Sequence, residues 1–488
     1  MDKICMHALR ASVDERYVGF KPNGASIKPV HIASGAARII FGQSSNTDGI
    51  KKLSYVCNAK GKTPTGNSID EIFEYLVSAG SIDADDISKD SLAALRSVLQ
   101  KVVAADDGVF GVNDGMISYS AGSSAFITRF AMYEDAGEFI GGIVKRFCPE
   151  LSSYIKNCMS SMDDPISVLF EPVLDNSGDR LYEELRHEEL PAFIEQGQQM
   201  KDYLEGLSTA GKCLLEHLVQ HPNKLTRLRL FNFYCIWGVI RYLSLLEAFY
   251  CGGSPRPIFL DFSNDSQSSI ARASVMCYTQ IHRAISRFYA WAFAQELIHL
   301  GYNKQELLNT DTPVYDISKE SKAGAAELSH MWELAKDDAR DCNEDEAVLI
   351  FGTAIYDMIA LEASSHPVNY LRSLGTLSGV LWPPTNFHVN KRFILSQDML
   401  EMILRCCVMP TEVIPATELR DRLWQRFGII IGGSEKDTAL LYETGSILHA
   451  DTDSLSNNFN HFAVALQNVN FAEVMADGIL QIRLGGTQ

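Results

Sequence analysis

Several short motifs in this chain contain residue types that bind phosphate. The segment Lys60-Gly61-Lys62-Thr63 ends like a phosphate-binding loop, but such a loop requires glycine at the position of Cys57. The flanking residues TPTG favour a turn, whereas a phosphate loop leads into a helix whose amides hold the anion. We therefore predict no nucleotide site here.

Candidate metal ligands are also sparse. His187-Glu188-Glu189 lacks the second histidine of the HExxH zinc motif. His330 and Glu333 would share one helical turn, but no third ligand accompanies them, and a solvated acidic helix is the favoured explanation. The sequence therefore predicts neither a bound metal nor a cofactor.

No nucleophile lies in a recognised catalytic setting. The segments SAGSSAF (120–126) and LGTLSGV (374–380) lack the GxSxG arrangement of serine hydrolases. The adjacent pair Cys406-Cys407 lies in an apolar helical pattern, which favours packing over redox chemistry. YDISKESK (315–322) resembles a nuclease triplet but follows no strand that could hold its carboxylates rigidly. We predict no catalytic residues.

A local excess of positive charge is the clearest binding signal. Residues 220–300 contain eight basic and four acidic side chains, although the chain's formal net charge is -18. On a helix expected over 268–300, Arg272, Arg283 and Arg287 would fall within ~60° of one another. Salt bridges to acidic neighbours are the alternative interpretation, and the acidity of the chain favours it. The residues predicted to bind nucleic acid or an acidic partner are Lys224, Arg227, Arg229, Arg272, Arg283 and Arg287.

The loop before that helix offers an alternative of a different class. SPRPIFLDFSNDSQSSIARAS (254–274) contains Arg256, Asp261 and Asp265, and His282 follows on the helix. These residues could assemble an enzyme site within 256–287. Asp265 is equally suited to begin a helix, which would give it a structural role.

Composition favours a soluble, cytoplasmic protein. The 61 acidic and 43 basic side chains repel polyanions at long range, so any nucleic-acid surface must be local. Eleven scattered cysteines without a CxxC pair fit a reducing compartment. The most apolar stretch, 230–250, includes Asn232, Arg241 and Glu247, which are costly in lipid. We therefore expect a buried core helix there and no contact with a membrane.

The elements that must position these residues are mainly helical. We expect a small α/β domain over 1–132, a helical domain over 133–395 and a winged-helix-like domain over 396–488. Within the first, ARIIF (37–41), LSYVC (53–57) and the region 117–130 are predicted strands because β-branched and aromatic residues dominate them. Ser68-Ile69-Asp70-Glu71 is a capping box that predicts a helix, and a second helix is expected over 91–104.

The rest of the chain shows apolar residues at three- and four-residue spacing. Near the end, Asp477-Gly478 is a hairpin signal, followed by alternation of Leu480, Ile482 and Leu484 with polar residues. Three or four helices and then a hairpin are the order of a winged helix. The helices expected between residues 136 and 468 lie near 136–147, 151–161, 178–188, 195–220, 224–250, 268–300, 322–340, 345–364, 367–375, 396–408, 417–427, 435–445 and 453–466.

Three arginines in TELRDRLWQRFGIIIGG (417–433) raise the question of DNA binding. Arg420, Arg422 and Arg426 give this segment charge, but a DNA-reading winged helix also needs basic residues on its later helix and wing. Residues 437–482 contain no lysine or arginine. We therefore expect the three arginines to pair with nearby acids or to contact a partner protein.

Four segments of the C-terminal half carry a resemblance. PIFLDFSNDSQSSIARAS (257–274) leads into HRAISRFYAWAF (282–293), and residues 366–405 lead into ELRDRLWQRFGIIIGG (418–433). Together they resemble uncharacterised helical proteins encoded in prokaryotic multi-gene anti-phage and DNA-modification clusters. The resemblance implies a subunit that works beside modification enzymes, ATPases or nucleases, and it assigns no functional residue.

These observations favour a non-enzymatic adaptor or regulatory subunit of a defence complex, whose partners are other protein subunits. The alternatives are a nucleic-acid-binding subunit that uses the basic residues of 224–287, and an enzyme whose site lies near 256–287.

Overall fold

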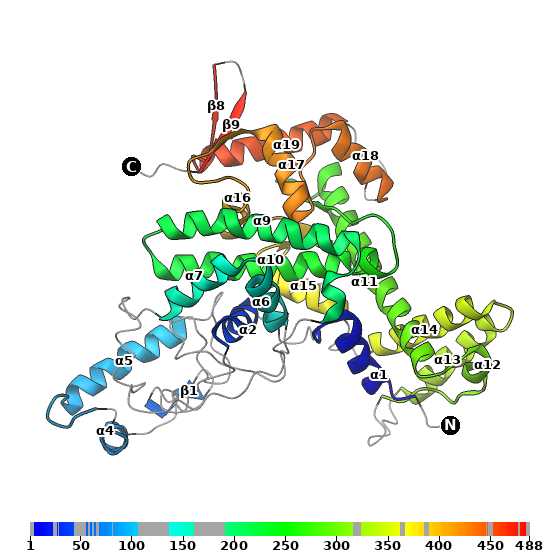
Figure 1. Cartoon of the computed structure of the whole chain (residues 1–488), viewed down its shortest axis with the longest axis horizontal. Helices are drawn as coiled ribbons and strands as arrows, with labels where there is room; N and C mark the ends of the chain where they lie inside the picture. The colour runs from blue at the N-terminus through cyan, green and yellow to red at the C-terminus, as the bar shows by residue number, and fades with distance from the viewer. Residues whose placement is uncertain are drawn as a thin grey trace.

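The computed structural model describes residues 4–22, 27, 29–42, 55–56, 59–60, 63–64, 68–80, 82–105, 136–160, 191–315, 324–361, 367–384, 390–445, 447, 452–476 and 479–484. Helices dominate these residues, and the strands are short (Figure 1), as the mainly α class predicts. No helix among them is long and apolar enough to cross a membrane.

Three long helices form the centre of the molecule: α9 (Gln198–Gln220), α10 (Lys224–Tyr250) and α11 (Ser269–His299). All three were expected from helical periodicity. Helix α10 is buried on nearly every side from Leu228 to Leu246, so it is the core helix that the apolar stretch predicts. Asn223 and Ser268 cap α10 and α11 by accepting hydrogen bonds from the backbone amides of Thr226 and Ala271.

The N-terminal residues join this helical body. Helix α1 (Met6–Val13) continues into a π-helical turn (Asp14–Val18), and α2 (Pro29–Phe41) packs against α6 (Ala136–Phe147) and α7 (Pro149–Ser160). The strand predicted at 37–41 is therefore wrong. A β-branched run also suits a helix buried all round, and periodicity alone cannot separate the two. Tyr55 and Val56, the described residues of the predicted strand 53–57, are helical as well.

Small residues allow α2 and α6 to approach closely. A Cβ on Gly35 would lie 2.6 Å from the Cα of Gly137, and one on Gly141 would lie 2.6 Å from the Cα of Ala36. Between the same helices, the Nε of Arg38 lies 2.6 Å from Oε1 of Glu138, and both side chains are almost fully buried. The charges neutralise each other where water cannot reach them.

Two helices extend from this body in Figure 1: α4 (Ile69–Ser78) and α5 (Lys89–Ala105). The capping box of α4 is confirmed, because the Ser68 hydroxyl accepts from the Glu71 amide and the Glu71 carboxylate accepts from the Ser68 amide. Two-residue strands, β1 (Ala59–Lys60) and β2 (Thr63–Pro64), pair antiparallel. The strands predicted within 117–130 and the helix predicted near 178–188 lie outside the described residues.

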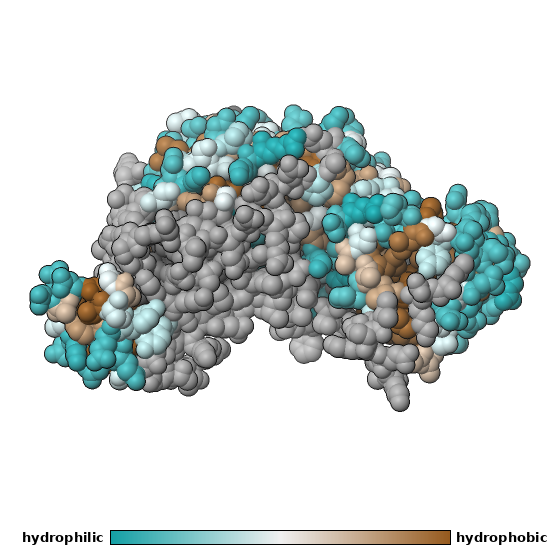
Figure 2. Space-filling view, turned by 60° about the horizontal axis from the view of Figure 1, so that its bottom comes forward, coloured by the Kyte–Doolittle hydropathy of each residue, from teal (hydrophilic) through white to brown (hydrophobic). Residues whose placement is uncertain are grey.

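A lobe beyond α11 contains α12 (Lys304–Asn309), α13 (Ala325–Ala339) and α14 (Glu344–Ala360). Helix α14 packs tightly on α11, since a Cβ on Gly352 would lie 2.3 Å from the carbonyl oxygen of Ala290. The outer end of this lobe is mostly hydrophilic (Figure 2), with a hydrophobic area toward the centre of the molecule. Helix α15 (Pro367–Leu377) returns to the central helices.

The remaining chain forms a C-terminal unit beside α9 and α11. Its helices are α16 (Gln397–Arg405), α17 (Ala416–Phe427), α18 (Glu435–Glu443) and α19 (Thr452–Asn468), all close to the predicted ranges. Strand β6 (Val413–Pro415), β8 (Ala472–Val474) and β9 (Leu480–Arg483) form an antiparallel sheet in the order β6-β9-β8. The paired strands β8 and β9 are those that the hairpin signal predicts, while its turn residues 477–478 lie outside the described residues.

Two further pairs of short strands connect this unit to the body. Strand β3 (Ile258–Phe259) pairs in parallel with β7 (Ile429–Ile430), and β4 (Leu381–Trp382) pairs antiparallel with β5 (Arg392–Phe393). Leu260 also bridges to Phe393. Residues 258–260 therefore lie between strands from two later parts of the chain.

A buried carboxylate links α1 to α11. Oδ1 of Asp14 accepts a hydrogen bond from the Tyr289 hydroxyl at 3.1 Å, and Oδ2 lies 3.5 Å from Nε of Arg10. Burial raises the pKa of Asp14 from 3.8 to about 7, although the Arg10 charge and the Tyr289 hydrogen bond act in the opposite direction.

This shift predicts a pH-dependent stability. Because the folded protein binds the proton more tightly than the unfolded chain, the contribution of Asp14 is fully present below pH 4 and is lost as the pH rises to about 7. The slope for one proton approaches ~1.4 kcal/mol per pH unit. Urea unfolding of Asp14→Asn and wild type between pH 4.5 and 7.5 should show the variant gaining relative stability with pH. The exposed Asp337→Asn is the control, and a difference independent of pH would contradict this role of Asp14.

Candidate functional site

The basic residues predicted to bind a polyanion lie in two groups. Lys224, Arg227 and Arg229 are at the start of α10, whereas Arg272, Arg283 and Arg287 are on α11. Figure 1 shows that α11 lies beside the end of α10, far from the residues where α10 begins. The structure therefore brings the first three together and the last three along one helix, but it does not join them into one continuous stripe.

The first group is largely engaged within the protein. The Arg227 Nε donates to the carbonyl oxygen of His221 at 2.6 Å, and its guanidinium lies over the ring of Tyr154. Arg229 lies 3.5 Å from Asp398 on α16. These contacts fix the start of α10 against α7 and α16, and they use donors that a phosphate would need.

The second group is more accessible. Arg272 and Arg283 are exposed, and neither has an ion pair among the described residues. They stand ~17 Å apart along the helix axis, from the rise of 1.5 Å per residue. Arg287 is also exposed, but its Nε lies 2.5 Å from Oε1 of Glu247 on α10. Two of the three arginines on α11 therefore have free charge.

Glu247 connects two of the arginines of this region. It contacts Arg287 through one oxygen and Arg256 through the other, the latter at 3.3 Å. Partial burial acts to raise the pKa of Glu247, but the hydrogen bond and charge of Arg287 and the charge of Arg256 lower it overall. Arg256 and Arg287 therefore form ion pairs with an acidic neighbour, as the salt-bridge interpretation of this region expects.

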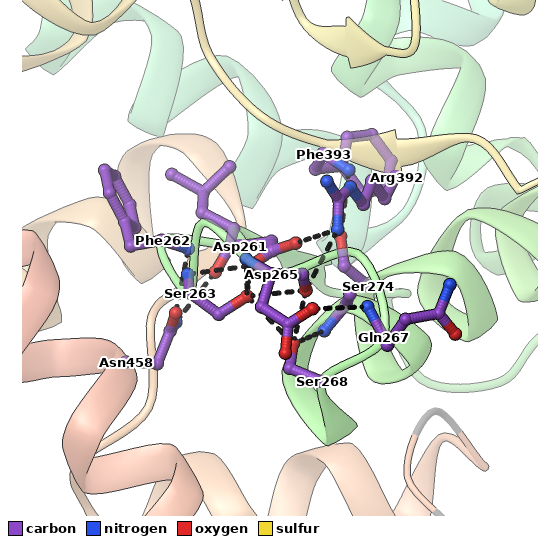
Figure 3. A network of polar contacts seen from close by, with 12 residues as sticks. Asp261, Phe262, Ser263, Asp265, Gln267, Ser268, Ser274, Arg392, Phe393 and Asn458 are labelled. Carbon is purple, nitrogen blue, oxygen red and sulfur yellow. Dashed lines mark hydrogen bonds and ion pairs between the residues drawn. The ribbon is translucent and has the colours of Figure 1, made fainter.

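The loop before α11 forms a polar network (Figure 3). Oδ2 of the fully buried Asp261 lies 2.9 Å from Nη1 of Arg392, and Oδ1 accepts from the amide and the hydroxyl of Ser263. The Ser263 hydroxyl lies 2.8 Å from that of Ser268, the cap of α11. Arg392 belongs to β5, so this network joins the start of α11 to a strand far along the chain.

Two more side chains extend the network. The Ser274 hydroxyl donates to the carbonyl oxygen of Phe259 and accepts from the amide of Phe393, each at 2.8 Å. The Asn458 amide nitrogen on α19 donates to the carbonyl oxygens of Leu260 and Ile431. Each of these polar groups lies in the interior and satisfies backbone groups that neighbouring strands leave unpaired.

These contacts bear on the enzyme site considered near 256–287. Asp261 is enclosed in its ion pair, and Asp265 accepts from the amide of Gln267 in the turn before α11. Arg256 contacts Glu247 and donates to the carbonyl oxygen of Thr444, while the His282 ring lies against Tyr278. Asp261 and Asp265 share the contacts of Ser263 and Arg392, whereas the contacts of Arg256 and His282 named here are with other residues.

The arginines of α17 are used inside the C-terminal unit. Arg422 binds Glu412 with two parallel contacts of 2.7 and 2.6 Å and also contacts Glu418 at 2.6 Å. The hydrogen bonds from Arg422 lower the pKa of Glu412 to about 2, even though burial opposes the shift. This bidentate ion pair fixes α17 to the loop before β6.

The other two arginines bind backbone carbonyls. Arg420 donates to Gly433 at 2.8 Å and lies over the ring of Phe459, with 5.0 Å between its Cζ and the ring centroid. Arg426 donates to the carbonyl oxygen of Cys406. The three arginines therefore hold α17 in place, and most of their charge faces the protein rather than a partner.

A cleft that the sequence analysis missed lies between α9, α10 and α17. It has a volume of about 450 Å³, and its lining includes Asp202, Glu205, Arg241, Trp424 and Arg426. Its lining carries both signs of charge, because Asp202 and Glu205 are exposed beside the two guanidinium groups. A simple anion is disfavoured here, because those carboxylates repel it.

Arg241 is the unusual residue of this cleft. It is 8% exposed, and no carboxylate pairs with it among the described residues. Its Nη1 donates to the carbonyl oxygen of Arg256 at 2.8 Å, and its guanidinium lies so close to Gly428 that a Cβ there would be 2.1 Å from its Cζ. Burial lowers the pKa of Arg241 to about 10. The C-terminal carbonyls of α17, whose C-cap is Gly428, supply negative potential that stabilises the cation.

The remaining motifs of the sequence are those considered for metal binding, cysteine chemistry, phosphate binding and nuclease activity. No group of three or more potential metal ligands occurs in the part of the chain that the structure describes. The Glu333 carboxylate contacts Lys336 at 2.9 Å. Cys406 and Cys407 are fully buried, and burial raises the pKa of both thiols, which keeps them protonated. Gly61, Lys62 and residues 316–322 lie outside the described residues.

The buried ion pair provides a test of how the units are joined. Asp261→Asn should lower the free energy of unfolding by ~3–5 kcal/mol, because it leaves the Arg392 charge buried without a partner. In the exposed pair Asp337–Arg340, Asp337→Asn should cost less than ~1 kcal/mol. Urea denaturation measures both. Equal effects of the two substitutions would show that Asp261 is not a buried structural charge.

When the chain is compared with protein-family models, with curated proteins and with solved structures, no match is found. The contacts, charges and burial of the described residues therefore carry the functional proposal.

Proposed function

We propose that this chain is a non-enzymatic adaptor or regulatory subunit of a multi-protein prokaryotic anti-phage complex, acting in the cytoplasm through protein–protein contacts. The observation that carries the proposal is the state of the arginines on α17. Arg420, Arg422 and Arg426 hold the C-terminal unit together, so the segment most suggestive of DNA binding has its positive charge engaged internally.

A winged-helix interpretation of the C-terminal unit has support from the order of its elements. Strand β6 precedes α17, α18 and α19, and the pair β8–β9 follows, with β9 in the centre of the sheet. A winged helix that reads DNA needs basic residues on its last helix and its hairpin. Residues 437–482, which include α19 and β8, contain none. A unit of this composition is better suited to protein than to DNA.

The link to defence complexes rests on the resemblance of four segments in the C-terminal half. Support comes from the way these segments meet. Ile258 of the first segment pairs with Ile429 of the last, and Asp261 of the first binds Arg392 of the third. The first of these segments thus contacts the third and the last, and the three lie in one connected interior.

Nucleic-acid binding is the second candidate function, and one observation favours it. Arg272 and Arg283 are exposed on α11 without ion pairs among the described residues, so both charges are available to phosphate. Against it stand the net charge of -18 and the ion pairs of Arg229 and Arg287.

The adaptor proposal predicts a stable complex. The chain, tagged at its genomic locus and purified under native conditions, should elute with other subunits at a mass well above its own 54.2 kDa. Mass spectrometry of that fraction should identify the products of neighbouring genes in stoichiometric amounts. A chain that elutes alone, or that hydrolyses nucleotides or cleaves nucleic acid when purified alone, would refute the proposal.

The rival function predicts a salt-dependent affinity for DNA or RNA. If it holds, the affinity measured by fluorescence anisotropy at two salt concentrations should fall steeply as salt rises, because neutralised phosphates release counterions. Arg272→Ala with Arg283→Ala should then flatten that dependence. Arg340→Ala, which removes an exposed charge on the distant lobe, is the matched control. Under the adaptor proposal we expect weak binding of DNA and RNA that neither the double variant nor Arg340→Ala changes.

A further inference from the structure

Among the described residues, strand β8 pairs with a strand on one side only, so it forms an edge of the three-stranded sheet. Its neighbour β9 is central, and β6 forms the opposite edge. Figure 1 shows the β8–β9 pair projecting beyond α19 and α18. Val474, Met475 and Ile479 are 41–51% exposed, so the projecting end carries apolar side chains in water. Exposed apolar edges are avoided in natural sheets unless something pairs with them.

The register shows which backbone groups point outward. The Arg483 amide donates to the carbonyl oxygen of Phe471 and the Met475 amide donates to that of Ile479, so positions 471, 473 and 475 face β9. The N–H and C=O groups of Ala472 and Val474 therefore face away from the sheet. They could form a ladder with a fourth strand without disturbing β9.

The other edge of the sheet is closed to such pairing. In β6 the central Ile414 lies opposite Ile482, so Val413 and Pro415 face outward. Pro415 has no backbone N–H to donate, and proline at an edge is a common protection against added strands. Strand β8 has no proline, and Glu473 is its single charged residue.

We propose that β8 is the docking site for an extended segment of a partner protein, which adds to the sheet as a fourth strand beside Ala472 and Val474. This inference rests on the proposed adaptor function and names the partner's chemistry. The side chains of Val474 and Met475 favour β-branched or aromatic residues opposite them. Glu473 is exposed and forms no ion pair among the described residues, so it favours lysine or arginine across from it.

Charge argues against a second copy of this chain as the occupant. Two β8 strands that pair antiparallel through all their outward groups match Ala472 of one copy with Val474 of the other. That register places the two Glu473 side chains directly opposite each other, in the closer type of pair. Like charges in that position destabilise a sheet. A heterologous basic strand avoids this repulsion.

Phage display tests the proposal. The full purified chain is the target, and peptides that bind it are selected from a random library. Selected peptides should alternate apolar β-formers with lysine or arginine. Their synthetic versions, measured by fluorescence polarisation, should bind Glu473→Lys about fivefold more weakly and Val474→Pro at least about tenfold more weakly, because proline removes an outward donor. Glu443→Lys, an equal charge reversal on α18, is the matched control and should bind as wild type does.

Hydrogen exchange gives a second readout. Bound peptide should slow exchange at the amide of Val474, which faces outward, and leave that of Glu473, already bonded to β9, unchanged. Circular dichroism and the thermal midpoint check that the variants fold. Peptides without basic residues, or peptides insensitive to Val474→Pro, overturn the proposal. Sedimentation provides another possible refutation. If the chain self-associates as its concentration rises, and Val474→Pro abolishes that association, then β8 pairs with a second copy of this chain and the proposal is wrong. If the native complex of the tagged chain survives Val474→Pro, the adaptor function stands and this docking site fails.

Discussion

The carboxylate of Asp261 is fully enclosed, and a buried charge is tolerated only beside an opposite charge and hydrogen-bond donors. Arg392 supplies the charge, and the amide and hydroxyl of Ser263 supply the donors. This requirement places β5 beside the start of α11 and keeps residues 258–260 between β5 and β7. Three further contacts depend on that arrangement: the capping of α11 by Ser268, the hydrogen bonds of Asn458 on α19, and the pairing of β3 with β7, the strand that follows α17.

Several arginines connect elements of the fold to one another. Arg38 holds α2 to α6, Arg241 lies against the C-terminal turn of α17, and Arg422 ties α17 to the loop before β6. Acidic side chains occur both in the interior, as Asp14, Glu138 and Asp261 do, and on the surface, as at the end of α13 and the start of α14. Among the described residues, buried charges of both signs therefore connect elements of the fold.

Local patterns predicted the mainly helical class and most of the described helices, whereas contacts between distant parts of the chain could not be predicted from them. Helices such as α10 and α11 follow from periodicity because side chains three and four positions apart share a face. The segment 37–41 was wrong because a buried helix and a strand favour the same β-branched residues. A helical projection showed that Arg272, Arg283 and Arg287 share a face, but it could not show that Glu247 reaches Arg287 from another helix. Nor could it show that Arg241, the isolated charge of an apolar segment, meets Gly428.

The pairing of residues 258–260 with residues 429–430 has a consequence for synthesis on the ribosome. Phe262 and Asn458, which also meet here, are 196 positions apart, so closing this region brings together distant parts of the chain at a considerable loss of entropy. Until residue 458 has emerged, the backbone around Leu260 lacks the partners that it has in the finished protein. The central helices can form early, but their junction is completed late. Nascent chains should therefore hold an exposed, unpaired segment around Leu260 for much of translation.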